Sequence, residues 1–88
     1  ATLIYYRDVR TSDPDFKIVQ RMGLLGYLPG WDAELDKPAD KNTIAGWEKF
    51  SGIKLKAEAG KATRRQVLID LYKQLNSKAT ATASIGAR

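Results

Sequence analysis

The chain has 88 residues and contains neither cysteine nor histidine. Its length suits one small domain, and 43% hydrophobic with 28% charged residues is typical of a folded chain. The two missing residue types exclude disulfides, thiol nucleophiles, imidazole acid–base chemistry and the usual zinc sites. No apolar run reaches the roughly 20 residues that a membrane-spanning helix needs. We therefore expect a small binding or structural module rather than an enzyme, with no cofactor and no metal.

Positive charge is concentrated in the second half of the sequence. Residues 1–53 hold seven Lys and Arg against eight Asp and Glu, whereas residues 54–88 hold eight against two. The two parts carry net charges of −1 and +6, and the whole chain carries +5. A basic half indicates an anionic partner, namely a nucleic acid, an acidic wall polymer or an acidic protein face, unless it is simply a solvated surface.

Residues 1–12 are expected to form an extended arm. Leu3, Ile4, Tyr5 and Tyr6 favour extended structure, but the run is too short to make a sheet alone. Exposed together, these side chains would form an apolar patch of the kind that soluble monomers avoid. We therefore expect the arm to be ordered, against its own core or against a neighbouring subunit.

Residues 13–76 are expected to contain three helices around one core. The first begins at Ser12-Asp13-Pro14, where a capping residue precedes a proline suited to a first turn, and it ends at Gly26. The second runs from about residues 40–43 to Phe50 and ends at Gly52, and the third runs from about residues 62–63 to Asn76. Helical spacing predicts that one core joins Ile18, Met22, Leu25, Trp47, Phe50, Val67, Leu71 and Leu75.

Two glycines, Gly23 and Gly46, lie inside these predicted helices. Each glycine lowers the stability of its helix by roughly 1 kcal/mol relative to alanine. We expect each to be there because it allows a neighbouring segment to approach closely. After the third helix, residues 77–88 are mostly Ala, Thr, Ser and Lys, and are predicted to be a flexible basic tail that becomes ordered only in an assembly.

A short repeat recurs at an offset of 20 residues. The stretch Asp40-Lys41-Asn42-Thr43, with Trp47 four positions later, is matched by Gly60-Lys61-Ala62-Thr63, with Val67 four positions later. In each copy we expect the threonine hydroxyl to cap a helix while the later apolar residue reaches the core.

These features resemble the bacterial peptidoglycan-binding domain family. Leu25-Gly26-Tyr27 is similar to the end of that family's first helix. Thr43, Gly46, Trp47 and Phe50 match its second motif, and Gly60 with Thr63 matches its third. The resemblance covers residues 14–75, with departures at Gln20, Asp40 and Ser51. It implies an all-α, three-helix bundle of peptidoglycan-binding-domain type. It also implies a non-catalytic module that binds peptidoglycan or another anionic wall polymer in the cell envelope or outside the cell.

A structural or assembly protein with the same small fold is the alternative. A phage virion component of the tail, baseplate or capsid is one such protein, with its arm and tail contacting neighbouring subunits. Sequence-specific binding of nucleic acid is not expected, because the link before the third helix, about ten residues long, exceeds the tight turn of a helix-turn-helix.

Five residues are predicted to bind the ligand: Tyr27, Trp31, Lys61, Arg64 and Arg65. The three cations surround the start of the third helix, whose amides also attract anions. Tyr27 and Trp31 either offer a flat ring to a sugar or peptide or fill the core, and for Trp31 we favour the core. The nearby Asp32, Glu34, Asp36 and Asp40 lack the ligand order of an EF-hand, so they predict a solvated acidic surface.

Overall fold

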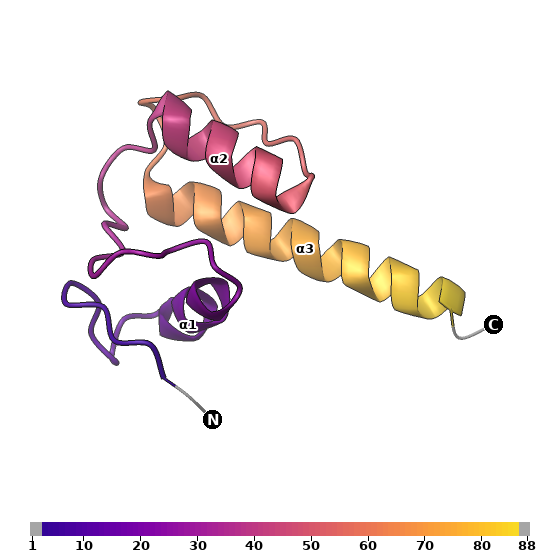
Figure 1. Ribbon diagram of the computed structural model, residues 1–88, viewed down its shortest axis with the longest axis horizontal. Helices are drawn as coiled ribbons and strands as arrows, with labels where there is room; N and C mark the ends of the chain where they lie inside the picture. The colour runs from indigo at the N-terminus through magenta and orange to yellow at the C-terminus, as the bar shows by residue number, and fades with distance from the viewer. Residues whose placement is uncertain (1–2, 87–88) are drawn as a thin grey trace.

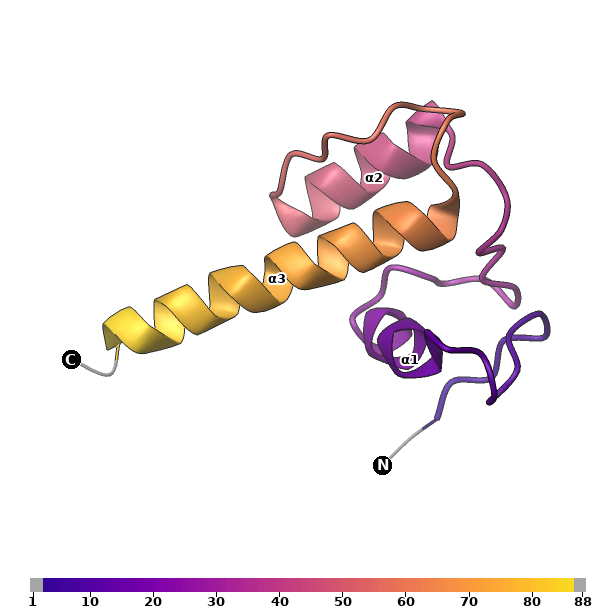
Figure 2. The ribbon, with the colours of Figure 1, turned by 180° about the vertical axis from the view of Figure 1, so that it is seen from behind.

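A computed structural model describes residues 3–86 of the protein, with side chains described as far as Lys78. In this range the chain forms α1 (Phe16–Leu24), α2 (Lys41–Ser51) and α3 (Arg64–Gly86), and no strand. Helix α2 lies along one side of α3, and α1 crosses its other side (Figures 1 and 2). The predicted all-α architecture with three helices is confirmed. None of the helices within residues 3–86 is long and apolar enough to cross a membrane.

The arm packs against α1. The side-chain oxygen of Gln20 accepts a hydrogen bond from the Ile4 amide at 2.8 Å, and its amide donates to the Ile4 carbonyl at 2.5 Å. Tyr6 is only 2% exposed and donates its hydroxyl to the Leu28 carbonyl at 2.6 Å. A Cβ at Gly23 would lie 2.4 Å from that hydroxyl. The packing reason expected for Gly23 is therefore confirmed, and the arm is ordered against its own core.

Helix α1 starts later than the sequence predicts and buries a different face. It begins at Phe16 rather than Pro14, because the Asp13 carboxylate holds the preceding turn by accepting from the Asp15 amide at 2.9 Å. Its buried residues are Val19, Gln20 and Met22, while Ile18 is only partly buried. Leu25 is 42% exposed, so its predicted core position is wrong. Leu25 is the C-cap of α1, and the chain turns directly after it at Gly26, whose φ is 99°.

The two copies of the repeat lie side by side. The Ala39 amide donates to the Ala62 carbonyl at 2.8 Å, and the Gly60 amide donates to the Ala39 carbonyl at 2.9 Å. Pro38 and Thr63 form an antiparallel bridge beside these bonds. The repeat thus aligns the starts of α2 and α3.

The two helix caps differ in kind. The Thr63 hydroxyl accepts from the Gln66 amide at 3.2 Å, and the Gln66 side chain accepts from the Thr63 amide at 2.9 Å. This reciprocal arrangement is a capping box. Helix α2 is capped instead by Asp40, which accepts from the Thr43 amide at 2.7 Å. The predicted cap is therefore confirmed at Thr63 and wrong at Thr43, whose hydroxyl accepts from Arg64.

Phe50 is 63% exposed, so its predicted place in the core is also wrong. Helix α2 buries Ile44 and Trp47, and the Trp47 indole donates to the Tyr27 carbonyl at 3.0 Å. Gly52, with φ of 74°, ends the helix one turn after Trp47. Phe50 lies in the last turn of α2, at the rim of the core, where its ring meets the Tyr27 ring edge-on.

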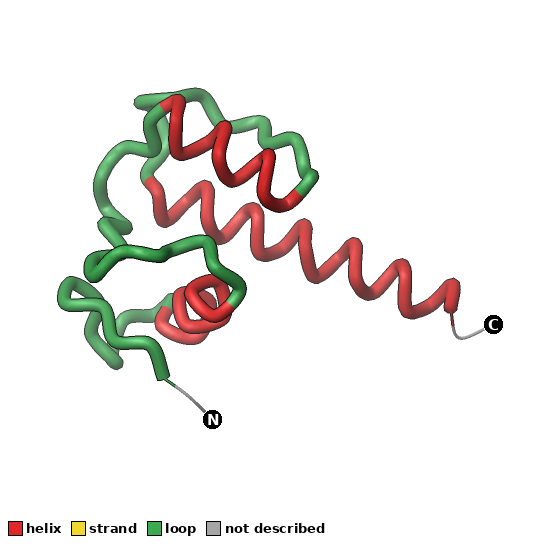
Figure 3. Tube along the Cα trace, viewed as in Figure 1, coloured by secondary structure: helices red, strands yellow, loops and turns green. Residues whose placement is uncertain are grey.

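Helix α3 continues past its predicted end at Asn76 as far as Gly86. Its second half extends away from α1 and α2 (Figures 1 and 3). Val67, Leu68 and Leu71 are buried, and Leu75 is partly buried against the core. The alanine-rich sequence beyond Asn76 favours propagation of a helix whose first turns are already anchored. The predicted helix end is therefore wrong, while Ala87 and Arg88 lie outside the described residues.

Loops contribute as much to the core as helices do. Much of the molecule around α1 consists of loop, as Figure 3 shows. Side chains from these segments are buried beside the helices: Tyr6, Val9, Leu28, Ala33, Leu35, Ala39 and Leu55.

Candidate functional site

The five residues predicted to bind a ligand do not form one site. Trp31 is 76% exposed, so its favoured core role is wrong, and its carbonyl accepts from the Arg7 amide at 3.0 Å. Tyr27 is buried, and burial raises the pKa of its hydroxyl. Lys61 lies on the surface in an ion pair with Glu58 at 2.8 Å.

Arg65 is surrounded by carboxylates of its own chain. Its Nη1 lies 2.8 Å from the Asp13 carboxylate and 2.6 Å from that of Asp15, and its Nε lies 3.1 Å from that of Asp36. The hydrogen bond from Arg65 lowers the pKa of Asp13, and the same bond raises the pKa of Arg65. Three carboxylates around one guanidinium do not leave it available to an anionic ligand. Arg65 instead fastens the start of α3 to the turn before α1.

The acidic loop at residues 32–36 is balanced by three cations, one from the loop's own end and two from distant segments. Its carboxylates line a cavity of about 730 Å³. Within the described part of the chain, no three acidic side chains are grouped so that they could hold a metal ion. Each of the three carboxylates after Trp31 has a partner: Asp32 contacts Arg7, Glu34 contacts Lys37, and Asp36 contacts Arg65.

Arg64 is held against α2. Its guanidinium lies over the Trp47 ring, 5.2 Å from the centroid. Its Nη1 donates to the Thr43 hydroxyl at 3.1 Å, and its Nε donates to the Ala33 carbonyl at 3.1 Å. The side chain is therefore fixed in place before any ligand arrives.

Tyr27 and Arg64 are the two predicted residues that the structure brings to one place. They line an open hollow of about 320 Å³ between α2 and the turn after α1. A Cβ at Gly46 would meet no atom of the described residues within 4 Å, so the expected packing reason for this glycine is wrong. We call this site the polar hollow after Asn42, Thr43 and Arg64, the polar side chains of a lining that is otherwise mostly apolar. Its lining residues are Gly26, Tyr27, Pro29, Asn42, Thr43, Gly46, Trp47, Phe50 and Arg64.

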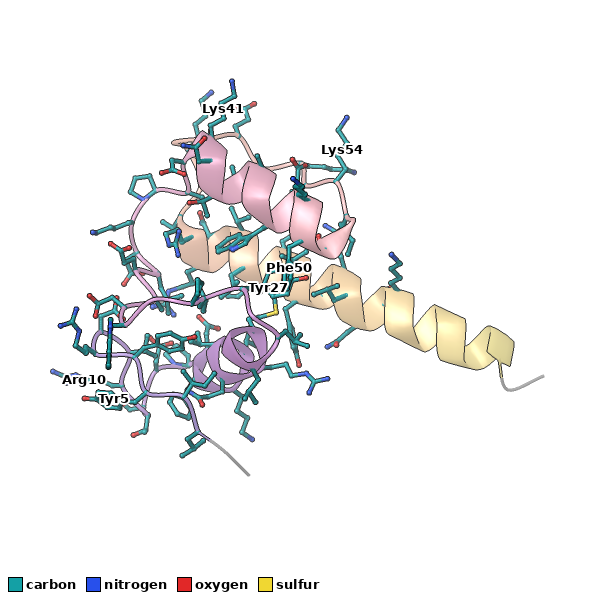
Figure 4. All side chains as sticks on the ribbon, in the orientation of Figure 1. Tyr5, Arg10, Tyr27, Lys41, Phe50 and Lys54 are labelled. Carbon is teal, nitrogen blue, oxygen red and sulfur yellow. The ribbon has the colours of Figure 1, made fainter. Side chains whose placement is uncertain are left out.

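A second recess lies on the other side of Phe50. The Phe50 ring meets Tyr27 edge-on, with centroids 4.9 Å apart, and Figure 4 shows the two residues together beside α3. Gly26, with φ of 99°, allows this approach, because a Cβ there would lie 3.3 Å from the Phe50 ring. We call this recess of about 390 Å³ the apolar groove, and it is lined by Arg21, Leu25, Tyr27, Phe50, Tyr72, Leu75 and Asn76.

Sequence reasoning missed Asn42 and Gly46 as parts of a candidate site. The available signal was a glycine inside a helix, which we interpreted as a packing device. Comparisons with protein-family models, with curated proteins and with solved structures find no match to this chain. The resemblance to the peptidoglycan-binding domain stays a prediction.

Proposed function

We propose that the protein is a non-catalytic binding module that holds bacterial cell-wall peptidoglycan in the polar hollow. The observation that supports this proposal most is the open space beside Gly46. A glycine in the middle of α2 costs about 1 kcal/mol relative to alanine. No described atom needs the space that the missing side chain leaves. A ligand that occupies this space would explain why position 46 carries no side chain.

The chemistry of the hollow suits a wall fragment. Asn42 and Arg64 supply hydrogen-bond donors for hydroxyl, acetamido and carboxylate oxygens, and Phe50 supplies an exposed ring. The lining contains no carboxylate, and the chain carries +5, so anionic groups are not repelled. The volume of about 320 Å³ lies at the lower end for small-molecule sites, so it fits one sugar or a short peptide.

Filling the hollow tests the proposal. Gly46→Leu places a side chain in open space, and replacing a helical glycine raises stability by roughly 0.5–1 kcal/mol. We expect the purified protein to sediment with insoluble peptidoglycan and Gly46→Leu to lose about ten-fold or more in affinity. The matched control is Ala45→Leu, an exposed neighbour on the same helix that does not line the hollow.

Neither variant should unfold, so a loss of binding can be assigned to the surface that was changed. Wild-type protein that stays in the supernatant contradicts wall binding. Gly46→Leu protein that still binds like the wild type shows that the polar hollow is not the site. Equal losses in Gly46→Leu and Ala45→Leu point to α2 as a whole rather than to the hollow.

A second candidate, an assembly subunit such as a phage virion component, is favoured by a different observation. Helix α3 extends beyond the other helices, where no described segment packs on its second half (Figure 2). A helix of this kind gains little stability in water without a partner. Leu3 and Tyr5 are exposed on the arm as well. Both features fit contacts with neighbouring subunits.

Truncation after Lys78 tests the second candidate. Among the side chains that the structure describes, Leu75 is the last that packs on the core, so we expect the melting temperature to change by less than about 3 °C. If the protein is an assembly subunit, the wild type self-associates in sedimentation velocity and the truncated form does not. Identical monomeric behaviour of both forms contradicts this candidate. A large fall in melting temperature shows instead that the end of α3 stabilises the folded monomer.

A further inference from the structure

We propose that the apolar groove is a docking site for an acidic, amphipathic helix of a partner protein. The groove and the polar hollow are separated by Phe50, and this inference does not depend on wall binding. It rests on the exposed side chains of the groove, on its charge and on its position beside α3.

The groove exposes large apolar side chains that a monomer has not buried. Phe50 and Leu25 are 63% and 42% exposed, and both line the groove. Tyr72 and Leu75 supply its floor from α3 and are only partly buried. Exposed apolar side chains that gather at one recess, rather than lying scattered, indicate an interaction surface. Burial of these side chains is the main favourable contribution that a partner would gain.

The charge around the groove selects an acidic partner. Arg21 is the charged residue among those lining it, and the lining holds no carboxylate. A second copy fits poorly, because a symmetric contact would place two groove linings against each other that each carry Arg21 and no carboxylate. Each copy also carries a net charge of +5.

The position of the groove suits a helix. Tyr72, Leu75 and Asn76 are spaced so that they share one face of α3. Helix α3 continues straight past the groove, away from the other two helices (Figures 1 and 2). A partner helix seated between α1 and α3 can therefore follow α3 beyond the groove and bury further surface. Apolar residues at helical spacing with carboxylates on the flanks are the matching pattern.

The test uses the full chain and a synthetic peptide. The probe is a fluorescent peptide of about 18 residues, with leucine at helical spacing and glutamate elsewhere. A second peptide carries lysine in place of every glutamate. We expect the acidic peptide to bind and the basic one not to bind. We expect Arg21→Glu to weaken binding of the acidic peptide by about ten-fold or more.

Two variants make the result specific to the groove. Arg10→Glu is the matched control, since Arg10 is exposed on the arm, away from Tyr27 and Phe50 (Figure 4), and it should change affinity less than about two-fold. Gly46→Leu fills the polar hollow one helical turn from Phe50, which lines both recesses. It should weaken peptide binding less than Arg21→Glu does, so a failure of wall binding is distinguishable. Hydrogen exchange should show protection at residues 21–27 and 72–76 when the acidic peptide binds.

Four results would overturn the proposal. One is no binding of the acidic peptide at concentrations up to about 1 mM. Another is equal binding of the basic peptide. A third is an equal loss of affinity in Arg10→Glu and Arg21→Glu. The fourth is a wild-type dimer that an apolar-groove variant, Leu75→Glu, converts to a folded monomer, which would make a second copy the occupant.

Discussion

Replacing Leu71 with alanine is expected to lower the free energy of unfolding by about 3–4 kcal/mol. Leu71 is fully buried in α3 and belongs to the same core cluster as Met22, Val67 and Leu68. The truncation removes apolar contacts and leaves a cavity that packed helices close only in part. A domain of this size has a total stability of only roughly 5–10 kcal/mol, so the variant should melt far earlier.

The informative comparison is with Phe50→Ala. Because Phe50 is mostly exposed, its loss should cost only about 1 kcal/mol, chiefly the edge-on contact with Tyr27. Urea unfolding followed by circular dichroism measures both variants. Similar losses for Leu71→Ala and Phe50→Ala would mean that Phe50 is buried in solution and would remove the exposed wall of both recesses.

Replacing Arg65 with glutamine is expected to lower the free energy of unfolding by about 2–3 kcal/mol at neutral pH. The side chains of Arg65, Asp13 and Asp15 are 24%, 16% and 22% exposed. The loss of the guanidinium leaves these carboxylates close together and largely out of water, without a cation. The partial exposure keeps the effect below that of a fully buried pair.

This effect should depend on pH in one direction. The hydrogen bond from Arg65 holds the pKa of Asp13 below its usual range. A carboxyl whose pKa is lower in the folded state stabilises the fold above its unfolded pKa of about 3.9. That contribution disappears as pH falls through the lower folded pKa. The stability difference between the wild type and Arg65→Gln should therefore be full above about pH 5 and shrink below about pH 4.

Arg7→Gln is the matched control for this prediction. Arg7 pairs with Asp32 at 2.8 Å, but their side chains are 65% and 37% exposed. Exposed pairs of this kind contribute little to stability, because water and salt screen the two charges. Equal losses for Arg65→Gln and Arg7→Gln, or a difference that does not change with pH, would show that Arg65 does not fasten α3 to the turn before α1.

The number of helices, their order and most of their ends can be predicted from the amino-acid sequence alone. These depend on local chemistry: Gly52 in a left-handed turn ends α2, and Thr63 with Gln66 starts α3. Helical spacing also identified residues that are buried, among them Met22, Trp47 and Leu71. Such features involve neighbours within about one helical turn, so the pattern of residues is enough to predict them.

Long-range packing, in contrast, determines which helix faces are covered and which cations are available to a ligand. Helical spacing placed Leu25 and Phe50 on apolar faces, but no segment reaches far enough to bury either side chain. Arg65 was predicted to bind an anion, yet the fold brings it to Asp13, 52 positions away in the sequence. Gly46 was expected to allow the close approach of a neighbouring segment, but a Cβ there would meet no described atom within 4 Å. Each outcome depends on segments far apart in the chain, and local spacing holds no information about which of them will meet.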